Sequence, residues 1–305
     1  MQELRYDGRV AIVTGGGRGL GRAYAELLAS RGAKVLVNDT GASIVGSEIT
    51  GNPADEVVAA ITAAGGEAIA CTESVATEAG GNAIIAQAMD TWGRVDILIH
   101  NAGNVRYGSL TDMSYDDFKA VTDVHLMGAY HVVRPAFPIM KQQQYGRVVL
   151  TGSIGGIYGH AGGVANYSVS KSAMIGLSNV IANEGLDDNI KSNVILPGAV
   201  TRMSEGVDTT NFPEMGPALV APVVAYLCHE SCEVSAEMMI SVAGRVARAF
   251  ITETEGCVRK TWQIEDVAEN LDAIRNADKQ WTLHPAEGAF MRHLTDSFAL
   301  VAEKG

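Results

Sequence analysis

Cysteine is scarce in this chain of 305 residues, which has only Cys71, Cys228, Cys232 and Cys257 at irregular spacing. A small disulfide-rich scaffold is therefore excluded. The stretch Cys-His-Glu-Ser-Cys at 228–232 brings thiols and an imidazole together. A structural zinc site usually needs a second such cluster, and the sequence has none. We therefore expect no metal site.

Long apolar runs and net positive charge are also missing. No run approaches the roughly 18 apolar residues of a membrane span, and the first ten residues lack the apolar core of a signal peptide. The formal net charge is -12, which disfavours nucleic acid or an anionic membrane as the main partner, since both need a basic surface. We expect a soluble, cytoplasmic protein with no membrane span and no nucleic-acid partner.

Glycine, in contrast, is abundant, with 34 residues against an average of about 7% of a typical chain. No glycine repeat, proline-rich tract or low-complexity run accounts for the excess. We therefore expect the glycines at turns and at places where backbone approaches a ligand.

Short runs rich in β-branched residues alternate with longer helical windows from residue 9 onward. This alternation is typical of a parallel sheet with crossover helices, and near-continuous apolar runs suit strands that are buried on both faces. The predicted fold class is α/β, a single doubly wound parallel sheet of the Rossmann type. Strands are expected at 9–14, 34–39, 67–72, 95–101, 146–152, 190–197 and 237–244, and helices near 19–31, 53–64, 78–91, 114–143, 166–185 and 217–230.

The pattern changes after residue 244, so we predict a main domain at 1–244 and a C-terminal helical extension at 245–305. The extension is expected to contain an extended piece near 249–253 and helices near 264–276 and 285–302. One helical stripe is formed by Phe290, Leu294, Phe298 and Val301. Such a stripe must pack on something, either as ordinary core on the same domain or as a contact with a neighbouring subunit.

A glycine-rich turn joins the first strand to the first helix in "VTGGGRGLGRAYAELLASRG", where Gly15, Gly17, Gly19 and Gly21 lie in the turn. Glycines there let the backbone approach a pyrophosphate, while the helix N-terminus supplies N–H groups and a positive dipole. Asp39 follows at the end of the second strand, 18 residues after Gly21, where a carboxylate can accept both hydroxyls of an adenosine ribose. The stretch predicts a dinucleotide site.

Asp39 also predicts which dinucleotide binds. Its carboxylate repels a 2′-phosphate, which favours NAD, whereas Arg18 in the loop could serve such a phosphate. We give priority to the acid, because overriding a carboxylate in contact with the ribose costs more than a flexible arginine gains. The expected cofactor is NAD.

Tyr167 and Lys171 are four residues apart in a helical window, so they share one helix face. A lone pair of this kind is common by chance. Together with "TGGGRGLG" at 14–21, "NAG" at 101–103, Ser153 and "YSVSK" at 167–171, the chain resembles the short-chain dehydrogenase/reductase family over residues 7 to about 244. The resemblance implies one Rossmann domain, 1–244, that binds NAD(P) and moves hydride to or from a carbonyl or alcohol.

The resemblance also implies three catalytic residues. Tyr167 is the general acid/base, Lys171 holds the nicotinamide ribose, and Ser153 stabilises the charge that develops on the substrate oxygen. A phenol is a poor base at neutral pH, so we expect Lys171 and the positive nicotinamide to lower its pKa. The alternative hydroxyls are those of Thr151, Ser168 and Ser170. The spacing from Ser153 to Tyr167 is 14, one longer than is common in the family, and we place the extra residue in the loop at 160–164.

The cofactor-binding residues that the loop, Asp39 and the resemblance imply are Gly15, Gly17, Arg18, Gly19, Leu20, Gly21, Asp39, Ser74, Val75, Asn101, Ala102, Gly103, Tyr167, Lys171, Pro197 and Val200. Ser74 and Val75 would flank the adenine, and the stretch 197–201 would contact the nicotinamide end. Where many family members have an asparagine that orders a proton-relay water, this chain has His125. Either its imidazole or its backbone carbonyl takes that task, or it is a buried structural histidine.

Further stretches, "NDTG", "VHLMGAY", "TGSIGGIYG" and "APVVAYLCHESCE", resemble the (3R)-hydroxyacyl-CoA dehydrogenases of this family, which are also described as 17β-hydroxysteroid dehydrogenases. We therefore expect a homodimeric or homotetrameric oxidoreductase acting on a secondary alcohol or ketone of a lipid-like substrate, first a 3-hydroxyacyl-CoA. The polar stretch 202–216 is predicted to be a lid over the substrate. The alternatives are a hydroxysteroid or other bulky alcohol as substrate, or a non-catalytic nucleotide-binding scaffold.

Overall fold

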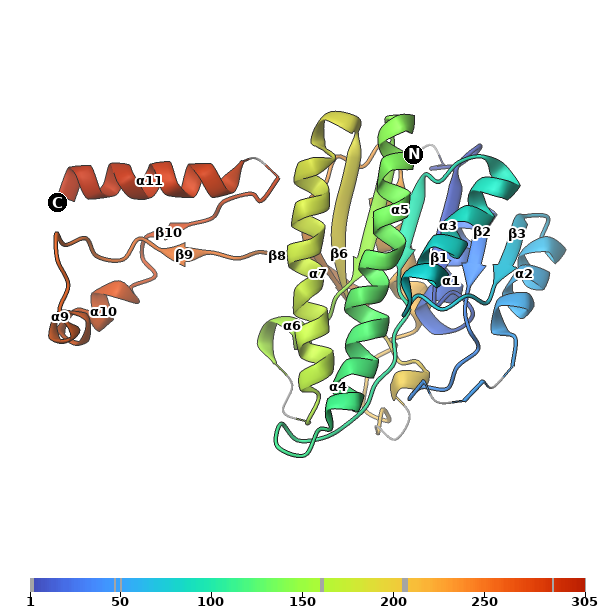
Figure 1. Cartoon of the computed structure of the whole chain (residues 1–305), viewed down its shortest axis with the longest axis horizontal. Coiled ribbons are helices and arrows are strands. Elements are labelled where there is room, and N and C mark those ends of the chain that lie inside the picture. Colours follow the sequence, from blue (N-terminus) through green and yellow to red (C-terminus); the bar gives the residue numbers. More distant parts are fainter. Residues whose placement is uncertain are drawn as a thin grey trace. The chain divides into compact units, whose positions relative to one another are not determined.

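The computed structural model describes residues 3–46, 48–49, 51–159, 162–204, 208–286 and 288–304 (Figure 1). The chain divides into two compact units, Met1–Arg248 and Ala249–Gly305. No helix in the described ranges combines the length and the apolar character that a membrane span requires.

One sheet forms the centre of the first unit. Its strands, in sequence order, are β1 (Val10–Thr14), β2 (Lys34–Asn38), β3 (Glu67–Cys71), β4 (Ile97–His100), β5 (Gly146–Thr151), β6 (Ile190–Gly198), β7 (Met238–Val242) and β8 (Arg245–Ala249). The order across the sheet is β3-β2-β1-β4-β5-β6-β7-β8. Every described pairing from β3 to β7 is parallel. The chain thus winds outward from β1 to β3 and then restarts beside β1 at β4, which confirms the predicted doubly wound α/β fold.

Helices cover both faces of this sheet. They are α1 (Gly19–Ser30), α2 (Pro53–Ala63), α3 (Glu78–Trp92), α4 (Tyr115–Thr122), α5 (Gly128–Gln143), α6 (Gly155–Tyr158), α7 (Ala165–Glu184) and α8 (Ala221–Cys228), with short helical turns η2 (Leu186–Asp188), η3 (Arg202–Ser204) and η4 (Pro217–Leu219). In Figure 1, α3, α5 and α7 lie side by side in front of the sheet. The helices α1, α2 and α8 pack on the opposite face.

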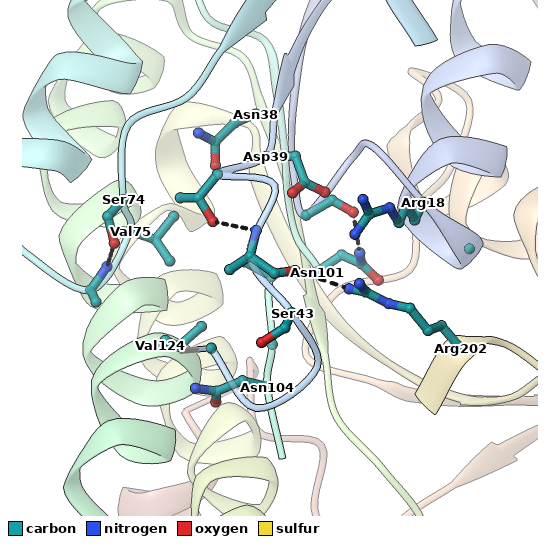
Figure 2. Close-up of a pocket in the computed structure, with 18 of the residues that line it drawn as sticks. Arg18, Asn38, Asp39, Ser43, Ser74, Val75, Asn101, Asn104, Val124 and Arg202 are labelled. Carbon is teal, nitrogen blue, oxygen red and sulfur yellow. Dashed lines mark hydrogen bonds between the residues drawn. The ribbon is translucent and has the colours of Figure 1, made fainter. Parts of the chain in front are cut away.

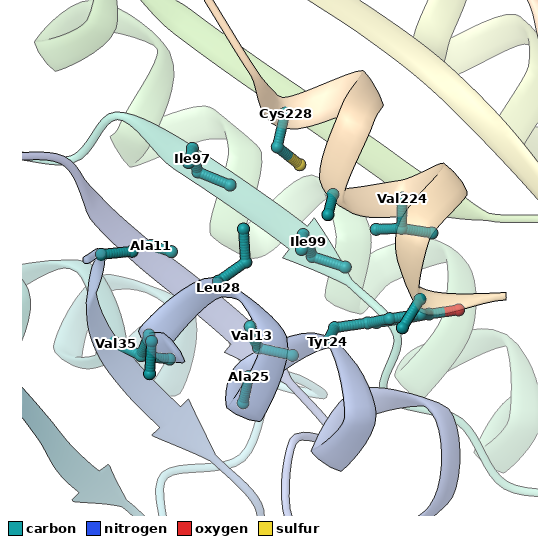
Figure 3. Packing of buried hydrophobic residues seen from close by; sticks show 14 of the residues in the cluster. Ala11, Val13, Tyr24, Ala25, Leu28, Val35, Ile97, Ile99, Val224 and Cys228 are labelled. Atoms are coloured by element: carbon teal, nitrogen blue, oxygen red, sulfur yellow. The ribbon is translucent and has the colours of Figure 1, made fainter. Parts of the chain in front are cut away.

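The core on the α1 side packs between the sheet and the helices α1 and α8. Tyr24 and Leu28 of α1 pack with Val224 and Cys228 of α8 over strand residues such as Ile99, and all five are buried (Figure 3). All five residues of β1 are buried as well. Because β1 leads directly into the glycine turn and α1, the turn is held from both ends by core packing.

The single helix expected at 114–143 contains an unexpected irregularity. Between α4 and α5 the chain forms a π-helical turn, η1 (Asp123–Met127). Such turns are rare and often mark functional sites. The apolar periodicity on either side does not predict this turn, whose His125 carbonyl oxygen lies 3.0 Å from the His100 Nε2 atom on β4.

The second unit contains the antiparallel pair β9 (Glu253–Thr254) and β10 (Gln280–Trp281), with α9 (Ile264–Glu269), α10 (Leu271–Ile274) and α11 (Ala289–Lys304). The helix expected at 264–276 is broken at Asn270, whose backbone leaves helical geometry. Phe290 and Phe298 of the predicted stripe are 77% and 67% exposed, so the second unit does not bury them by itself. A subunit contact stays a prediction.

Candidate active site and cofactor groove

The turn between β1 and α1 is so tight that two of its glycines leave no room for a side chain. Gly15 has a φ of +62°, and a Cβ atom there would lie 2.8 Å from the Cα atom of Ala102. A Cβ atom on Gly17 would lie 2.8 Å from the Asp39 Oδ2 atom. Side chains at these positions would separate the turn from the two strand ends that face it, so the glycines bring backbone N–H groups up to the open space above the sheet.

Asp39 is held at the edge of that space by two backbone N–H groups. Gly17 donates to its Oδ2 atom at 3.0 Å, and Gly41 donates to its Oδ1 atom at 2.9 Å. A carboxylate has about four acceptor sites, so each oxygen keeps capacity for one more donor. The arrangement suits a ligand that offers two neighbouring hydroxyl groups.

A cavity of about 420 Å³ runs over the carboxyl ends of β1, β2 and β4 (Figure 2). Ten of the sequence-predicted cofactor residues line it: Gly15, Arg18, Gly19, Leu20, Asp39, Ser74, Val75, Asn101, Ala102 and Gly103. Gly17 and Gly21 shape the turn behind it. Tyr167, Lys171, Pro197 and Val200 do not line this cavity.

One wall of the cavity comes from residues 40–46, which the sequence analysis missed. The backbone N–H of Val105 donates to the carbonyl oxygen of Ile44 at 3.0 Å, and the Arg106 Nε atom donates to that of Val45 at 3.1 Å. Arg202 reaches the Ala42 carbonyl oxygen at 3.3 Å. The connection at 39–52 is longer than the usual two to six residues of such loops, and that length was the available signal.

The structure brings Ser153, Tyr167 and Lys171 together beyond the carboxyl end of β5. Ser153 lies near enough to the Tyr167 hydroxyl group to exert a lowering effect on its pKa. The Lys171 Nζ atom lies 5.5 Å from the Tyr167 ring centroid and donates to the carbonyl oxygen of Thr151 at 2.6 Å. Among the alternative hydroxyls, Ser170 is buried and donates to the carbonyl oxygen of Asn166, so its proton is already used within the helix.

Burial determines the acid–base properties of Tyr167 and Lys171. It lowers the pKa of Lys171 to about 7. It also raises the pKa of Tyr167, against the opposing effect of Ser153 and with a further increase from Tyr107. The expected lowering of the tyrosine pKa is therefore wrong for the protein groups alone, because desolvation of the phenolate outweighs their favourable interactions.

His125, the proposed relay residue, is buried in η1 with its ring edge-on to the Tyr167 ring at 5.5 Å. Its Nε2 atom lies 2.8 Å from the carbonyl oxygen of Asn104, and burial lowers its pKa well below the usual value. Its own carbonyl oxygen accepts hydrogen bonds from Gly128 and His100. Both groups considered for the relay are thus engaged inside the protein, and the relay stays a prediction.

Exposed apolar side chains surround this end of the sheet. They lie on the segments that follow β4, β5 and β6: Tyr107, Leu110, Ile154, Ile157, Tyr158, Val200 and Phe212. The Val200 N–H donates to the carbonyl oxygen of Met215 at 2.7 Å, so the predicted lid starts and ends at one point. Residues 205–207 of the lid and 160–161 of the loop before Tyr167 lie outside the described residues.

No group of three or more histidine, cysteine and acidic side chains that could hold a metal ion occurs in the part of the chain that the structure describes. In the stretch 228–232, Cys228 and Cys232 are buried. The His229 imidazole contacts Ser231 and the carbonyl oxygen of Arg5. These interactions account for the stretch as part of the fold.

Several known proteins are similar to this chain. The peroxisomal multifunctional enzyme type 2 of Drosophila melanogaster is 44% identical over 301 residues, covering 96% of this chain and 50% of that protein. The enzyme of the same name from Mus musculus is 41% identical over 304 residues, with coverage of 96% and 41%. The chain thus spans half or less of these relatives. They carry peroxisomal names, and the expected cytoplasmic location stays a prediction.

The structural comparisons agree with the sequence comparisons. The full-length Drosophila enzyme gives a TM-score of 0.82 at 39% identity, covering 98% of this chain and 50% of that one. A short chain dehydrogenase from Mycobacterium avium gives 0.77 at 35% identity, covering 90% and 98%. The family model described as short chain dehydrogenase matches residues 9–211. The chain therefore belongs to the short-chain dehydrogenase/reductase family and is an oxidoreductase that uses a nicotinamide cofactor.

Proposed function

We propose that this chain is an NAD-dependent dehydrogenase that interconverts the secondary alcohol and ketone of a 3-hydroxyacyl-CoA. The observation that carries the proposal is the meeting of Ser153, Tyr167 and Lys171 beyond the carboxyl end of β5. The substrate class is supported by likeness to the multifunctional enzymes over 96% of the chain, extension included. The exposed apolar side chains around the site suit an acyl chain.

In the proposed oxidation, the Tyr167 oxygen takes the proton of the substrate alcohol. Ser153, which lies near the Tyr167 hydroxyl group, donates to the substrate oxygen and stabilises the charge that develops there. Lys171 holds the nicotinamide ribose from the same helix face. Bound NAD⁺ supplies the hydride acceptor and a positive charge. A positive charge near the phenol opposes the effect of burial on its pKa.

The groove favours NAD over NADP in this proposal. The spare acceptor capacity of Asp39 fits the two ribose hydroxyls, whereas a 2′-phosphate would bring like charges together. Arg202 also lines the cavity, and we assign it to the diphosphate. Tyr167, Lys171, Pro197 and Val200 complete the nicotinamide end in this proposal, outside the cavity of Figure 2.

A hydroxysteroid is the second candidate substrate, because the exposed Tyr107, Leu110 and Tyr158 side chains would also suit a flat apolar ring system. A turnover screen with NAD⁺ against 3-hydroxydecanoyl-CoA, a 17β-hydroxysteroid and a simple secondary alcohol separates the two. We expect the highest kcat/KM with the thioester. Higher efficiency with the steroid would put the second candidate first.

The Tyr167→Phe variant is the matched control for the screen. Its ring still fills the site while the proton-accepting oxygen is gone, so it should bind NADH normally and lose most turnover. If wild type shows no turnover with any substrate class yet binds NADH, the chain is a nucleotide-binding scaffold. Substantial turnover in the variant would remove Tyr167 from its role.

We also propose that residues 1–244 form the catalytic domain and that 245–305 pack on it or on a neighbouring subunit of a homodimer or homotetramer. The exposed Phe290 and Phe298 support a packing role for α11. Light scattering of wild type and of Phe298→Asp tests this. A variant that keeps its oligomeric state and its thermal stability would show that α11 makes no such contact.

A further inference from the structure

We propose that Thr14 and His100 form a positioning pair. The pair holds two parts of the site together, namely the turn Asn101–Gly103, which lines the cofactor groove, and the π-helical turn that carries His125. Thr14 ends β1 and His100 ends β4. Both side chains are buried, with exposures of 0% and 2%.

The Thr14 hydroxyl group has only one way to satisfy its neighbours. Its oxygen lies 3.1 Å from the Asn101 nitrogen and 3.2 Å from the Ala102 nitrogen, and both backbone N–H groups donate to it. A hydroxyl oxygen has two lone pairs and one proton. With both lone pairs used, the proton is directed to the His100 Nδ1 atom, 3.1 Å away.

Because the Thr14 hydroxyl group is the donor in its hydrogen bond to His100, the tautomer of His100 is determined. Nδ1 must accept, so the ring proton of a neutral imidazole is on Nε2. Burial, with a smaller contribution from Lys171, lowers the pKa of His100 to about 3, so the ring stays neutral at working pH. The Nε2 proton is then donated to the carbonyl oxygen of His125 at 3.0 Å.

The carbonyl oxygen of His125 is fixed by this bond and by the Gly128 N–H group. The helix can approach His100 because Gly128 has no side chain. A Cβ atom there would lie 3.3 Å from the His100 Cε1 atom and 2.9 Å from the Val75 Cγ2 atom. His100 thereby sets the position of the π-helical turn, whose His125 ring packs against the Tyr167 ring.

The pair therefore couples cofactor and catalytic groups through one directed set of hydrogen bonds, from Thr14 to His100 to the carbonyl of His125. Neither side chain contacts the reacting atoms in this proposal, so both are positioning residues. Losing the Thr14 hydroxyl should loosen the turn Asn101–Gly103. Losing the His100 Nε2 donor should release the turn that carries His125.

The first test reads the tautomer directly in the wild-type protein by two-dimensional ¹⁵N NMR of histidine side chains, with the His100→Asn variant for assignment. We expect a pyridine-like Nδ1 and a pyrrole-like Nε2 that do not change between pH 6 and 8. A proton on Nδ1, or a ring that titrates in this range, would overturn the proposal. This readout does not depend on the substrate.

The second test compares variants that each keep one hydrogen bond. The His100→Gln variant keeps an N–H donor at the distance of Nε2, so it can still donate to the carbonyl oxygen of His125. The shorter His100→Asn side chain keeps an acceptor near Thr14 but cannot reach that carbonyl oxygen. With 3-hydroxydecanoyl-CoA and NAD⁺, we expect kcat to fall about tenfold in the asparagine variant and to be largely retained in the glutamine variant, with NADH affinity unchanged in both. Equal kcat values in the two variants would contradict the proposal.

Thr14→Val and Thr14→Ser form the complementary pair. The valine variant leaves the N–H groups of Asn101 and Ala102 without their acceptor, so NADH should bind about tenfold more weakly, while serine restores wild-type affinity. The His100 tautomer should also become mixed in the valine variant only. Unchanged NADH affinity in Thr14→Val would refute the coupling even if the proposed substrate proves wrong, because NADH binding needs no substrate.

Discussion

Burial moves the pKa of Tyr167 upward and that of Lys171 downward, so both side chains favour their neutral forms in the protein without its cofactor. The lysine donates to a carbonyl oxygen rather than to a carboxylate, so this contact brings no opposite charge that would compensate its desolvation. At the residue scale, the protonation of Tyr167 and Lys171 therefore depends on the charge of the cofactor that binds beside them.

The lysine should make stability depend on pH in a specific window. Its folded pKa of about 7 lies below the usual lysine value of 10.5, so between these values the unfolded chain binds more protons and stability rises with pH. Replacing Lys171 by Met removes this dependence. The difference in Tm, variant minus wild type, should be largest near pH 7 and shrink toward about pH 10. A pH-independent difference would show that Lys171 titrates normally.

Asp39 gives a prediction about cofactor choice. Wild type should prefer NAD⁺, and Asp39→Ala should narrow or reverse the preference, because the like-charge repulsion of a 2′-phosphate is gone and Arg18 in the same groove can meet it. The ratio of kcat/KM for NAD⁺ and NADP⁺ measures this. An Asp39→Asn variant, which keeps the shape, serves as the control. Preference of the wild type for NADP⁺ would mean that Arg18 outweighs Asp39.

At the element scale, the close approach of the strand-end turn to the π-helical turn depends on Gly103. A Cβ atom there would lie 2.5 Å from the His125 Cε1 atom. Gly103→Ala should therefore displace the His125 ring from Tyr167 and lower kcat by at least tenfold, with a lower Tm. Gly176→Ala on α7, where a Cβ atom meets nothing within 4 Å, is the control and should raise Tm slightly. Unchanged kcat in Gly103→Ala would show that catalysis does not depend on the position of the His125 ring.

At the scale of the whole molecule, the question is how an acidic protein would bind the phosphorylated arm of CoA. The net charge of -12 requires any basic patch to be local. Arg202 lines the cofactor groove, and Arg248 and Arg259 pair with Glu237 and Asp266. Both arginine side chains are 42% exposed, so the pairs are worth little and can open to a phosphate.

A true acyl-CoA enzyme gains binding energy far from the reacting carbon and uses it to position the substrate. We expect much higher kcat/KM with 3-hydroxydecanoyl-CoA than with the same acyl group on a short pantetheine thioester, and a gap that shrinks as salt is added. A salt series on both thioesters measures it. Equal efficiency on the truncated thioester would show that the CoA arm is not recognised.

The sequence by itself determined the order of strands and helices, the glycine turn, Asp39 and the spacing of Ser153, Tyr167 and Lys171, because periodicity and motif spacing are local properties of the chain. Only the tertiary structure decided the remaining features. The wall at 40–46 and the His100 hydrogen bond to the π-helical turn join residues that are far apart in sequence. The pKa directions at Tyr167 and Lys171 depend on burial by the whole fold, and desolvation is set by everything that surrounds a group rather than by its neighbours along the chain.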